Sequence, residues 1–142
     1  MTASEFSAGG VVFNERGETV VIVPTRRAAG GSKVLALPKG HPDPHEAPEA
    51  AALREVREEA GVEAEVVGPL GEVRYVYQRE GRRVAKVVAF FLLKYRSGRP
   101  EEHDAEVEMA RWMPLREAAT ALTYPGEREM AARALSRIAQ PE

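Results

Sequence analysis

Three glutamates, Glu55, Glu58 and Glu59, have the spacing in this sequence with the clearest capacity for chemistry. In an α-helix, residues i, i+3 and i+4 lie on one face, so these carboxylates would gather along one edge. Taken alone, such a run is usually a solvated charged face, because like charges at this spacing weaken a helix. The same edge offers the carboxylate oxygens that a hard dication such as Mg²⁺ prefers, and substrate phosphates could complete the ion's shell.

A helix is expected to hold these carboxylates from Pro48 to about Ala60. Proline suits the first turn of a helix, and Gly61 suits the residue that follows the last turn. Leu53 and Val56 join Ala60 in an apolar stripe that points roughly away from the glutamates. The acidic edge is therefore expected to face solvent or a ligand.

The rest of the chain alternates β-rich runs with turn signals, which predicts an α/β fold with helices packed on a mixed sheet. Ser7–Phe13 and Thr19–Val23 flank a turn at Asn14–Gly17 and suggest a hairpin. Val84–Leu93 is apolar on both faces and is the expected central strand. Further strands are expected over 34–37, 65–67, 73–78 and 110–113, loops over 28–32, 39–48 and 97–104, and helices from Pro114 to about Leu122 and from Pro125 onward.

The composition indicates a globular protein of ordinary size. The 142 residues fit one domain, residues 1–142, with a single core. A net charge of −2 gives no basic field for a long nucleic acid but leaves small phosphorylated ligands open. There is no cysteine, so a metal site must use oxygen or imidazole ligands. No signal peptide or bilayer-spanning run is found, so we expect a cytoplasmic protein without a membrane partner, as a monomer or homodimer.

The residues around the three glutamates complete a longer pattern. Gly40 is followed after five residues by Glu46, and then after seven residues by Arg54-Glu55-Val56, one residue, Glu58-Glu59, one residue and Gly61-Val62. Every fixed position of the Nudix box is filled, so the chain resembles the Nudix hydrolases, with the box at residues 40–62. The resemblance implies an α/β/α sandwich in which helices flank a mixed β-sheet.

The resemblance also implies roles for residues of the box. Glu55, Glu58 and Glu59 would bind Mg²⁺, with Mn²⁺ as an alternative, and the Gly40 carbonyl would add a ligand. Either Glu58 or Glu59 would help to deprotonate the attacking water. The implied reaction is hydrolysis of a nucleoside-linked pyrophosphate, for which bound metal ions supply water activation and charge neutralisation.

Four more residues follow from the same resemblance. Arg54 and Glu46 resemble the pair that orients the helix and its glutamates. Many members bring a further acidic residue from a later loop, and here Glu106 is the first candidate and Glu108 the second. A solvated acidic loop is the alternative for both. Ala47 stands where members often have a capping Ser or Thr, which costs the helix roughly 1 kcal/mol.

Residues outside the box carry the information about the substrate. Pro38-Lys39-Gly40-His41 resembles the loop of dinucleoside polyphosphate hydrolases, in which residues equivalent to Lys39 and His41 contact phosphates. Tyr75 and Tyr77 share a strand face where those hydrolases tend to have a base-stacking tyrosine. A solvated loop and ordinary packing on the sheet are the respective alternatives.

Two additional side chains are candidates for substrate contact. Lys86 interrupts an apolar strand, where its ammonium must reach water or an anion such as a phosphate. Tyr124 could flank a nucleotide or pack on the final helix. Arg26 and Arg27 are interpreted as a solvated pair.

The leading hypothesis is hydrolysis of a dinucleoside polyphosphate such as diadenosine tetraphosphate, with the small nucleotide as the partner molecule. One alternative is a MutT-type nucleoside triphosphate pyrophosphohydrolase that clears damaged nucleotides. RNA 5′-end pyrophosphate removal is a further option, although no basic track supports it. A non-catalytic nucleotide sensor is the alternative from another class, and three mutually repelling carboxylates argue against it.

Overall fold

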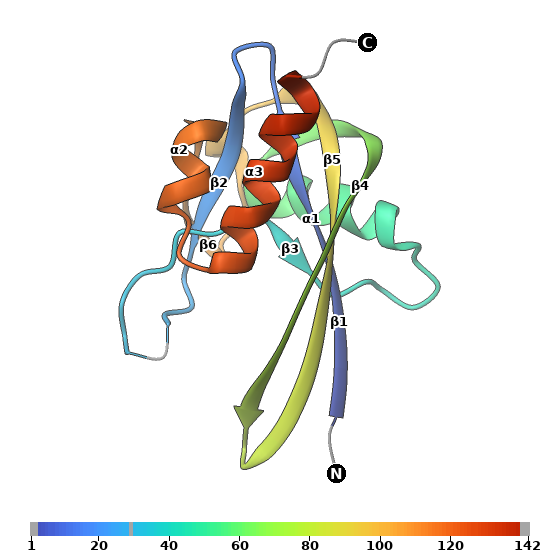
Figure 1. Cartoon of the computed structure of the whole chain (residues 1–142), viewed down its shortest axis with the longest axis vertical. Coiled ribbons are helices and arrows are strands. Elements are labelled where there is room, and N and C mark those ends of the chain that lie inside the picture. Colours follow the sequence, from blue (N-terminus) through green and yellow to red (C-terminus); the bar gives the residue numbers. More distant parts are fainter. Residues whose placement is uncertain (1–2, 29, 140–142) are drawn as a thin grey trace.

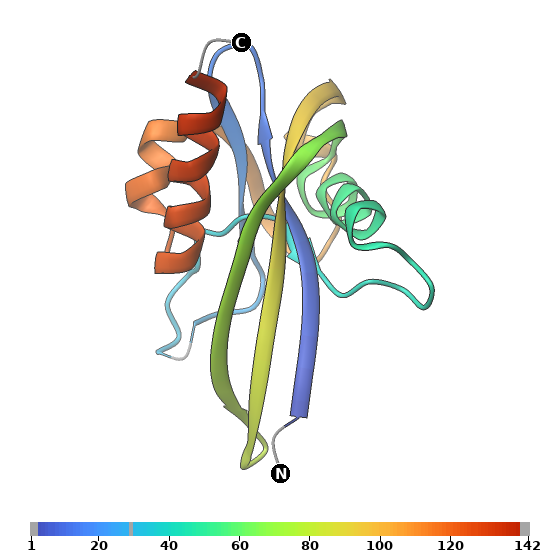
Figure 2. The ribbon, with the colours of Figure 1, turned by 45° about the vertical axis from the view of Figure 1, so that its right-hand side comes forward.

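A computed structural model describes residues 3–28 and 30–139, so residues 1–2 and 140–142 of the expected domain, and residue 29 of the expected loop, lie outside it. A mixed sheet lies between two helical layers (Figures 1 and 2). Helix α1 covers one side, and α2 and α3 cover the other. The α/β sandwich expected from the sequence is therefore confirmed. The helices are α1 (Pro48–Ala60), α2 (Leu115–Ala121) and α3 (Pro125–Ala139), with a 3-10 turn, η1, at Pro100–Glu102.

The strands form two sheets. The larger has the order β3-β1-β5-β4, and the smaller pairs β2 with β6. Strands β1 and β5 are parallel, whereas the other pairs are antiparallel. Strand β5 thus lies inside the larger sheet, as its two apolar faces predicted. The bounds are β1 (Ala3–Phe13), β2 (Glu18–Pro24), β3 (Lys39–Gly40), β4 (Val62–Arg79), β5 (Arg82–Gly98) and β6 (Val107–Pro114).

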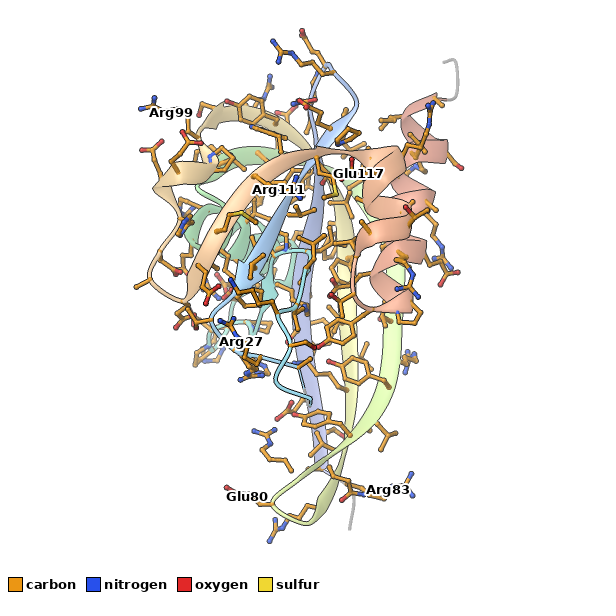
Figure 3. The ribbon with its side chains drawn as sticks, turned by 90° about the vertical axis from the view of Figure 1, so that its left-hand side faces the viewer. Arg27, Glu80, Arg83, Arg99, Arg111 and Glu117 are labelled. Carbon is orange, nitrogen blue, oxygen red and sulfur yellow. The ribbon has the colours of Figure 1, made fainter. Side chains whose placement is uncertain are left out.

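Alternation along the strands divides the core between the two sides of the sheet. On β5, Phe91 and Leu93 pack with Val56 of α1, whereas Phe90 and Leu92 pack with Met130 of α3. Beyond this core, β1, β4 and β5 continue past the helices (Figure 2). Glu80 and Arg83 mark their tip, at the opposite end of the molecule from Arg99 (Figure 3). The sheet therefore has a covered half and an open half.

The expected hairpin between the first two strands is wrong. The turn exists, because the Gly17 N–H donates to the Asn14 carbonyl at 3.1 Å, but the strands separate into different sheets. Residues 7–12 of β1 are all buried, so this strand is interior and has β3 and β5 as its two neighbours. β2 pairs with β6 instead.

The expected strand over 34–37 is also wrong, and the short strand β3 lies in the segment that was expected to be a loop. Only Ala36 bridges to β2, through Ile22. The Leu37 N–H donates to the Glu127 carboxylate at 2.9 Å, and the Leu35 N–H donates to the Thr123 hydroxyl at 2.8 Å. Side chains from around the start of α3 thus satisfy backbone groups that a strand neighbour would otherwise bond.

Other boundaries differ in extent. β4 runs without interruption from Val62 to Arg79, with register shifts, where two separate strands were expected. Helices α1 and α3 lie where they were predicted, with Pro48 at the first turn of α1 and Gly61 after it in the left-handed conformation, φ 68°. Among the described residues, no helix has the length and apolar composition that crossing a bilayer requires.

Candidate active site

Helix α1 presents Glu55, Glu58 and Glu59 to different surroundings. Glu58 is exposed and Glu59 is partly buried, but Glu55 is only 9% exposed. Of the two expected surroundings of the acidic edge, solvent or a ligand, open solvent is therefore not found at Glu55. The reason is β3, which crosses this helix so closely that a Cβ added at Gly40 would overlap the Glu55 carboxylate.

Arg54 connects the acidic residues of the site. Its Nη1 donates to Glu55 Oε1 at 2.9 Å and to Glu58 Oε1 at 3.0 Å. Its Nε and Nη2 donate to Glu46, each at 3.0 Å, and Nη2 also donates to the His41 carbonyl at 3.0 Å. The hydrogen bonds to Glu46 raise the pKa of Arg54, and those bonds lower the pKa of Glu46. This one guanidinium thus joins α1 to the loop that precedes it.

Glu59 is held from β3 rather than by Arg54. The Lys39 backbone N–H donates to Glu59 Oε1 at 2.9 Å. Burial raises the pKa of Glu59 to about 8, and the charges of Glu55 and Asp104 act in the same direction. Burial also raises the pKa of Glu55, with smaller contributions from Glu58 and Glu106. Two carboxylates are thus desolvated within a single turn, a position that favours a nearby cation.

The loop before β6 contributes further acidic groups. Glu106 is exposed, and its charge contributes to the raised pKa of Glu55. Glu108, by contrast, pairs with Arg27 at 2.6 Å and with Lys33 at 3.4 Å. Arg27 is exposed, as expected of a solvated residue, and it also forms this ion pair at the surface. Asp104, which sequence reasoning missed, lies near Glu59, and its N–H donates to the Glu58 carbonyl at 2.8 Å. Its place at the end of the predicted polar loop was the available signal.

The donor set suits a hard dication, because it consists of carboxylate oxygens and backbone carbonyls. Within residues 3–28 and 30–139, no three acidic or imidazole groups converge closely enough to hold an ion as they stand. Arg54 Nη1 occupies the position between Glu55 and Glu58. Glu58 is exposed, so its side chain can turn at small cost. Glu55 shares the charge of Arg54 with Glu46 and Glu58, and burial raises the pKa of both Glu55 and Glu59, so a cation beside them would be favoured.

The side chain of Lys39 reaches toward α3, whereas its backbone N–H donates to Glu59 of α1. Its Nζ is 2.7 Å from Glu127 Oε2, at the start of α3. Burial alone would lower the pKa of Lys39, but Glu127, with smaller contributions from Glu59 and Tyr75, raises this pKa overall. A substrate phosphate would have to share this ammonium with Glu127, a buried acid that no sequence motif singled out.

The open half of the sheet carries the tyrosines and Lys86. Tyr75 pairs with Lys86 across β4 and β5, and Lys86 pairs with Glu5 across β5 and β1. The ammonium of Lys86 is 4.0 Å from Glu5, whose carboxylate also accepts a hydrogen bond from the Tyr77 hydroxyl and contacts Arg79. Burial, together with the charge of Lys39, lowers the pKa of Lys86. Lys86 and Tyr77 thus already have Glu5 as a polar partner.

Tyr75 and Tyr124 are the freer aromatic side chains of this region, each 43% exposed. Burial raises the pKa of Tyr75, and the charges of Lys39, Glu127, Tyr124 and Arg26 also reach it. Tyr75 therefore lies near Lys39 of β3, the start of α3 and the loop after β2. His41 directly follows β3 in the chain, and its Nδ1 lies 3.0 Å from the Phe6 carbonyl.

Known proteins resemble this chain in sequence and in fold. The sequence model of the NUDIX domain matches residues 4–134. A "Putative mutator protein MutT4" of Mycobacterium tuberculosis is 37% identical over 134 residues, which is 92% of this chain and 54% of that protein. The chain therefore spans about half the length of this relative.

Two solved structures show the same fold. A NUDIX hydrolase from Nitrosomonas europaea has a TM-score of 0.75 and 18% identity, covering 98% of this chain and 97% of its own. A Caenorhabditis elegans Ap4A hydrolase in a binary complex has a TM-score of 0.66 and 20% identity, covering 95% of this chain and 98% of its own. At these identities, the likeness concerns the fold.

Proposed function

Because the chain belongs to the NUDIX domain family, we propose that it hydrolyses nucleoside-linked pyrophosphates with the help of a divalent metal ion, preferentially Mg²⁺. One observation carries this proposal: β3 and Arg54 hold Glu55 and Glu59 partly desolvated, beside a third carboxylate that is free to turn. A bound dication would neutralise phosphate charge and lower the pKa of a water molecule. The chain's own residues would then have to bind and orient the substrate, and one of them would have to accept a proton from the attacking water.

Each residue of the site has a part in this proposal. Glu55, Glu58 and Glu59, with the Gly40 carbonyl, would hold the ion, and Glu59 or Glu58 would accept the proton of the attacking water. Arg54 keeps Glu55 in place and is itself fixed by Glu46. Glu106 and Asp104 supply negative charge from the loop before β6. Such positioning accounts for most of what a protein contributes to phosphoryl transfer.

For the substrate, we propose a dinucleoside polyphosphate such as diadenosine tetraphosphate. Tyr75 of β4 and Tyr124, just before α3, are both exposed, and the charges of Lys39 and Arg26 reach Tyr75. Aromatic faces of this kind stack on bases, and adjacent cations attract a polyphosphate chain. Lys86, which pairs with Tyr75, and His41, which contacts Phe6 of β1, are further candidates for phosphate contact.

The test is a panel of nucleotides with Mg²⁺, read by mass analysis of the products in ¹⁸O-labelled water. The expected result is the fastest turnover on a dinucleoside polyphosphate, with the label on one defined product. Faster turnover of ADP-ribose or of an oxidised nucleoside triphosphate would contradict the substrate proposal. If the wild-type protein, saturated with Mg²⁺, turns over no nucleotide of the panel, the hydrolase proposal itself is contradicted.

A second candidate substrate is a nucleoside triphosphate cleaved to a monophosphate and pyrophosphate. The sequence likeness to a protein named as a putative mutator protein supports it. Release of pyrophosphate from an oxidised triphosphate, at a higher kcat/KM than any dinucleotide, would favour this candidate. A non-catalytic sensor would instead bind a nucleotide without any turnover.

A further inference from the structure

The buried acid of α3 has no part in the chemistry proposed above. Glu127 lies in the first turn of α3 and is 3% exposed. Both of its carboxylate oxygens contact one short segment. Oε1 accepts the Leu37 N–H at 2.9 Å, and Oε2 lies 2.7 Å from Lys39 Nζ. A carboxylate is costly to bury unless it is paired and hydrogen-bonded in this way.

The segment that Glu127 holds also contacts the glutamates of α1. Successive residues of a strand point to opposite faces, so Lys39 and Gly40 face different helical layers of the fold. The Lys39 side chain reaches α3, whereas the backbone at Gly40 packs on the Glu55 carboxylate. The Lys39 N–H donates to Glu59 Oε1 at 2.9 Å. Residues 37–40 thus connect Glu127 in one helical layer to Glu59 in the other.

The third side of this segment is fixed by β1. The Gly10 N–H donates to the Pro38 carbonyl at 3.2 Å, and a Cβ added at Gly9 would lie 2.5 Å from that carbonyl oxygen. The segment is therefore pressed against β1 and has little freedom to shift sideways. Its position along the direction from α3 to α1 depends on the contacts of Glu127 and Lys39.

From this geometry we propose that Glu127 is a positioning residue for the reaction, acting through Lys39 on Glu59. It fixes the ammonium of Lys39 and the N–H of Leu37, and so sets where the Lys39 N–H meets the Glu59 carboxylate. The proposal rests on the proposed function, because it assigns Glu59 a place in the reaction. Displacements of about 1 Å in such a support can slow turnover about a hundredfold.

The test compares Glu127→Gln with a matched control, Glu129→Gln. Glutamine keeps an oxygen for the Leu37 N–H but removes the charge that holds Lys39. Glu129 lies on the same helix, is exposed, and pairs with Arg133 at 3.1 Å rather than with residues 37–40. We expect Glu127→Gln to lower kcat about ten- to a hundredfold with less than a threefold change in KM, and Glu129→Gln to change neither.

A second readout does not depend on turnover. Amide hydrogen exchange, followed by NMR, should become at least about tenfold faster at Lys39 in Glu127→Gln and stay unchanged in Glu129→Gln. If the wild type turns over no nucleotide, the proposed function fails, and the exchange at Lys39 still tests the connection. If Glu127→Gln lowers Tm while kcat and the exchange at Lys39 remain at wild-type values, Glu127 has only a structural role and the proposal is overturned.

A double variant covers the case in which the single variant does not fold. Glu127→Gln combined with Lys39→Met removes both charges, so neither remains buried alone. It keeps the Lys39 backbone N–H, and we expect it to fold and to show the same loss of kcat as Glu127→Gln, with a separate rise in KM because the Lys39 ammonium is a proposed phosphate contact. A folded double variant with wild-type kcat would overturn the proposal.

Discussion

The acidic helix α1 and the tyrosine-bearing end of β4 and β5 differ in how far their functional side chains are already fixed. In α1, Arg54 and the Lys39 N–H hold Glu55 and Glu59 against β3. On β4, Tyr75 has no such partner among the hydrogen bonds of the described residues and is 43% exposed. Under the proposed function, the rigid region would set the reaction geometry, and the region that can adapt would bind the ligand.

The largest effect is expected from changing a fixed carboxylate. Glu59→Gln keeps the size and the acceptor for the Lys39 N–H but removes the charge and the capacity to accept a proton. We expect kcat to fall by about a thousandfold or more, within the range that acid-base and electrostatic groups contribute. Steady-state kinetics on the best substrate of the panel measure it. Glu63→Gln, an exposed glutamate just after the helix, is the control that should retain full activity.

The second effect tests whether the close contact between β3 and α1 matters. Gly40→Ala would place a Cβ on the Glu55 carboxylate, so the strand or the carboxylate must move. We expect kcat to fall about tenfold to a hundredfold and stability to fall by about 1–3 kcal/mol. Kinetics and chemical denaturation together measure the two. Gly30→Ala is the control, since a Cβ there meets nothing within 4 Å. Equal activity of the two variants would remove the distinction between a rigid and an adaptable region.

The third effect concerns the adaptable region. Tyr75→Ala removes a stacking surface, which is worth about 1–3 kcal/mol per base, so KM for a dinucleoside polyphosphate should rise about tenfold or more. kcat should change little, because Tyr75 has no role in water activation. Val76→Ala alters the adjacent exposed residue on the opposite face of β4 and should leave KM unchanged. A fall in kcat without a rise in KM for Tyr75→Ala would contradict the assignment of binding to this region.

The smallest effect sharpens the comparison by strengthening α1 without touching its glutamates. Ala47 occupies the N-cap position with an extended backbone, and no side chain caps the helix there. Ala47→Ser should stabilise the protein by about 1 kcal/mol, or about 2–4 °C in Tm, and leave kcat unchanged. Thermal unfolding measures the gain. Ala47→Val, which cannot cap, is the control that should bring no gain.

The success of the sequence-based predictions follows the range of the interactions involved. The bounds of α1, its terminal Gly61 and the interior place of β5 were predicted, because local periodicity and capping encode them. The partner of β1 was not, because a buried strand can accept either an antiparallel neighbour or a parallel one. Nothing within residues 7–23 indicates that β5, many residues later, is the neighbour.

The same division applies to the candidate site. The family pattern and the one-sided spacing of Glu55, Glu58 and Glu59 could be read directly from residues 40–62, because both are local features of the chain. The burial of Glu55 under Gly40, and the contact between Glu127 and Leu37, 90 residues away, arise only when the chain has folded. Burial and ion pairing depend on which distant segments the packed core brings together, and a local pattern does not specify that choice.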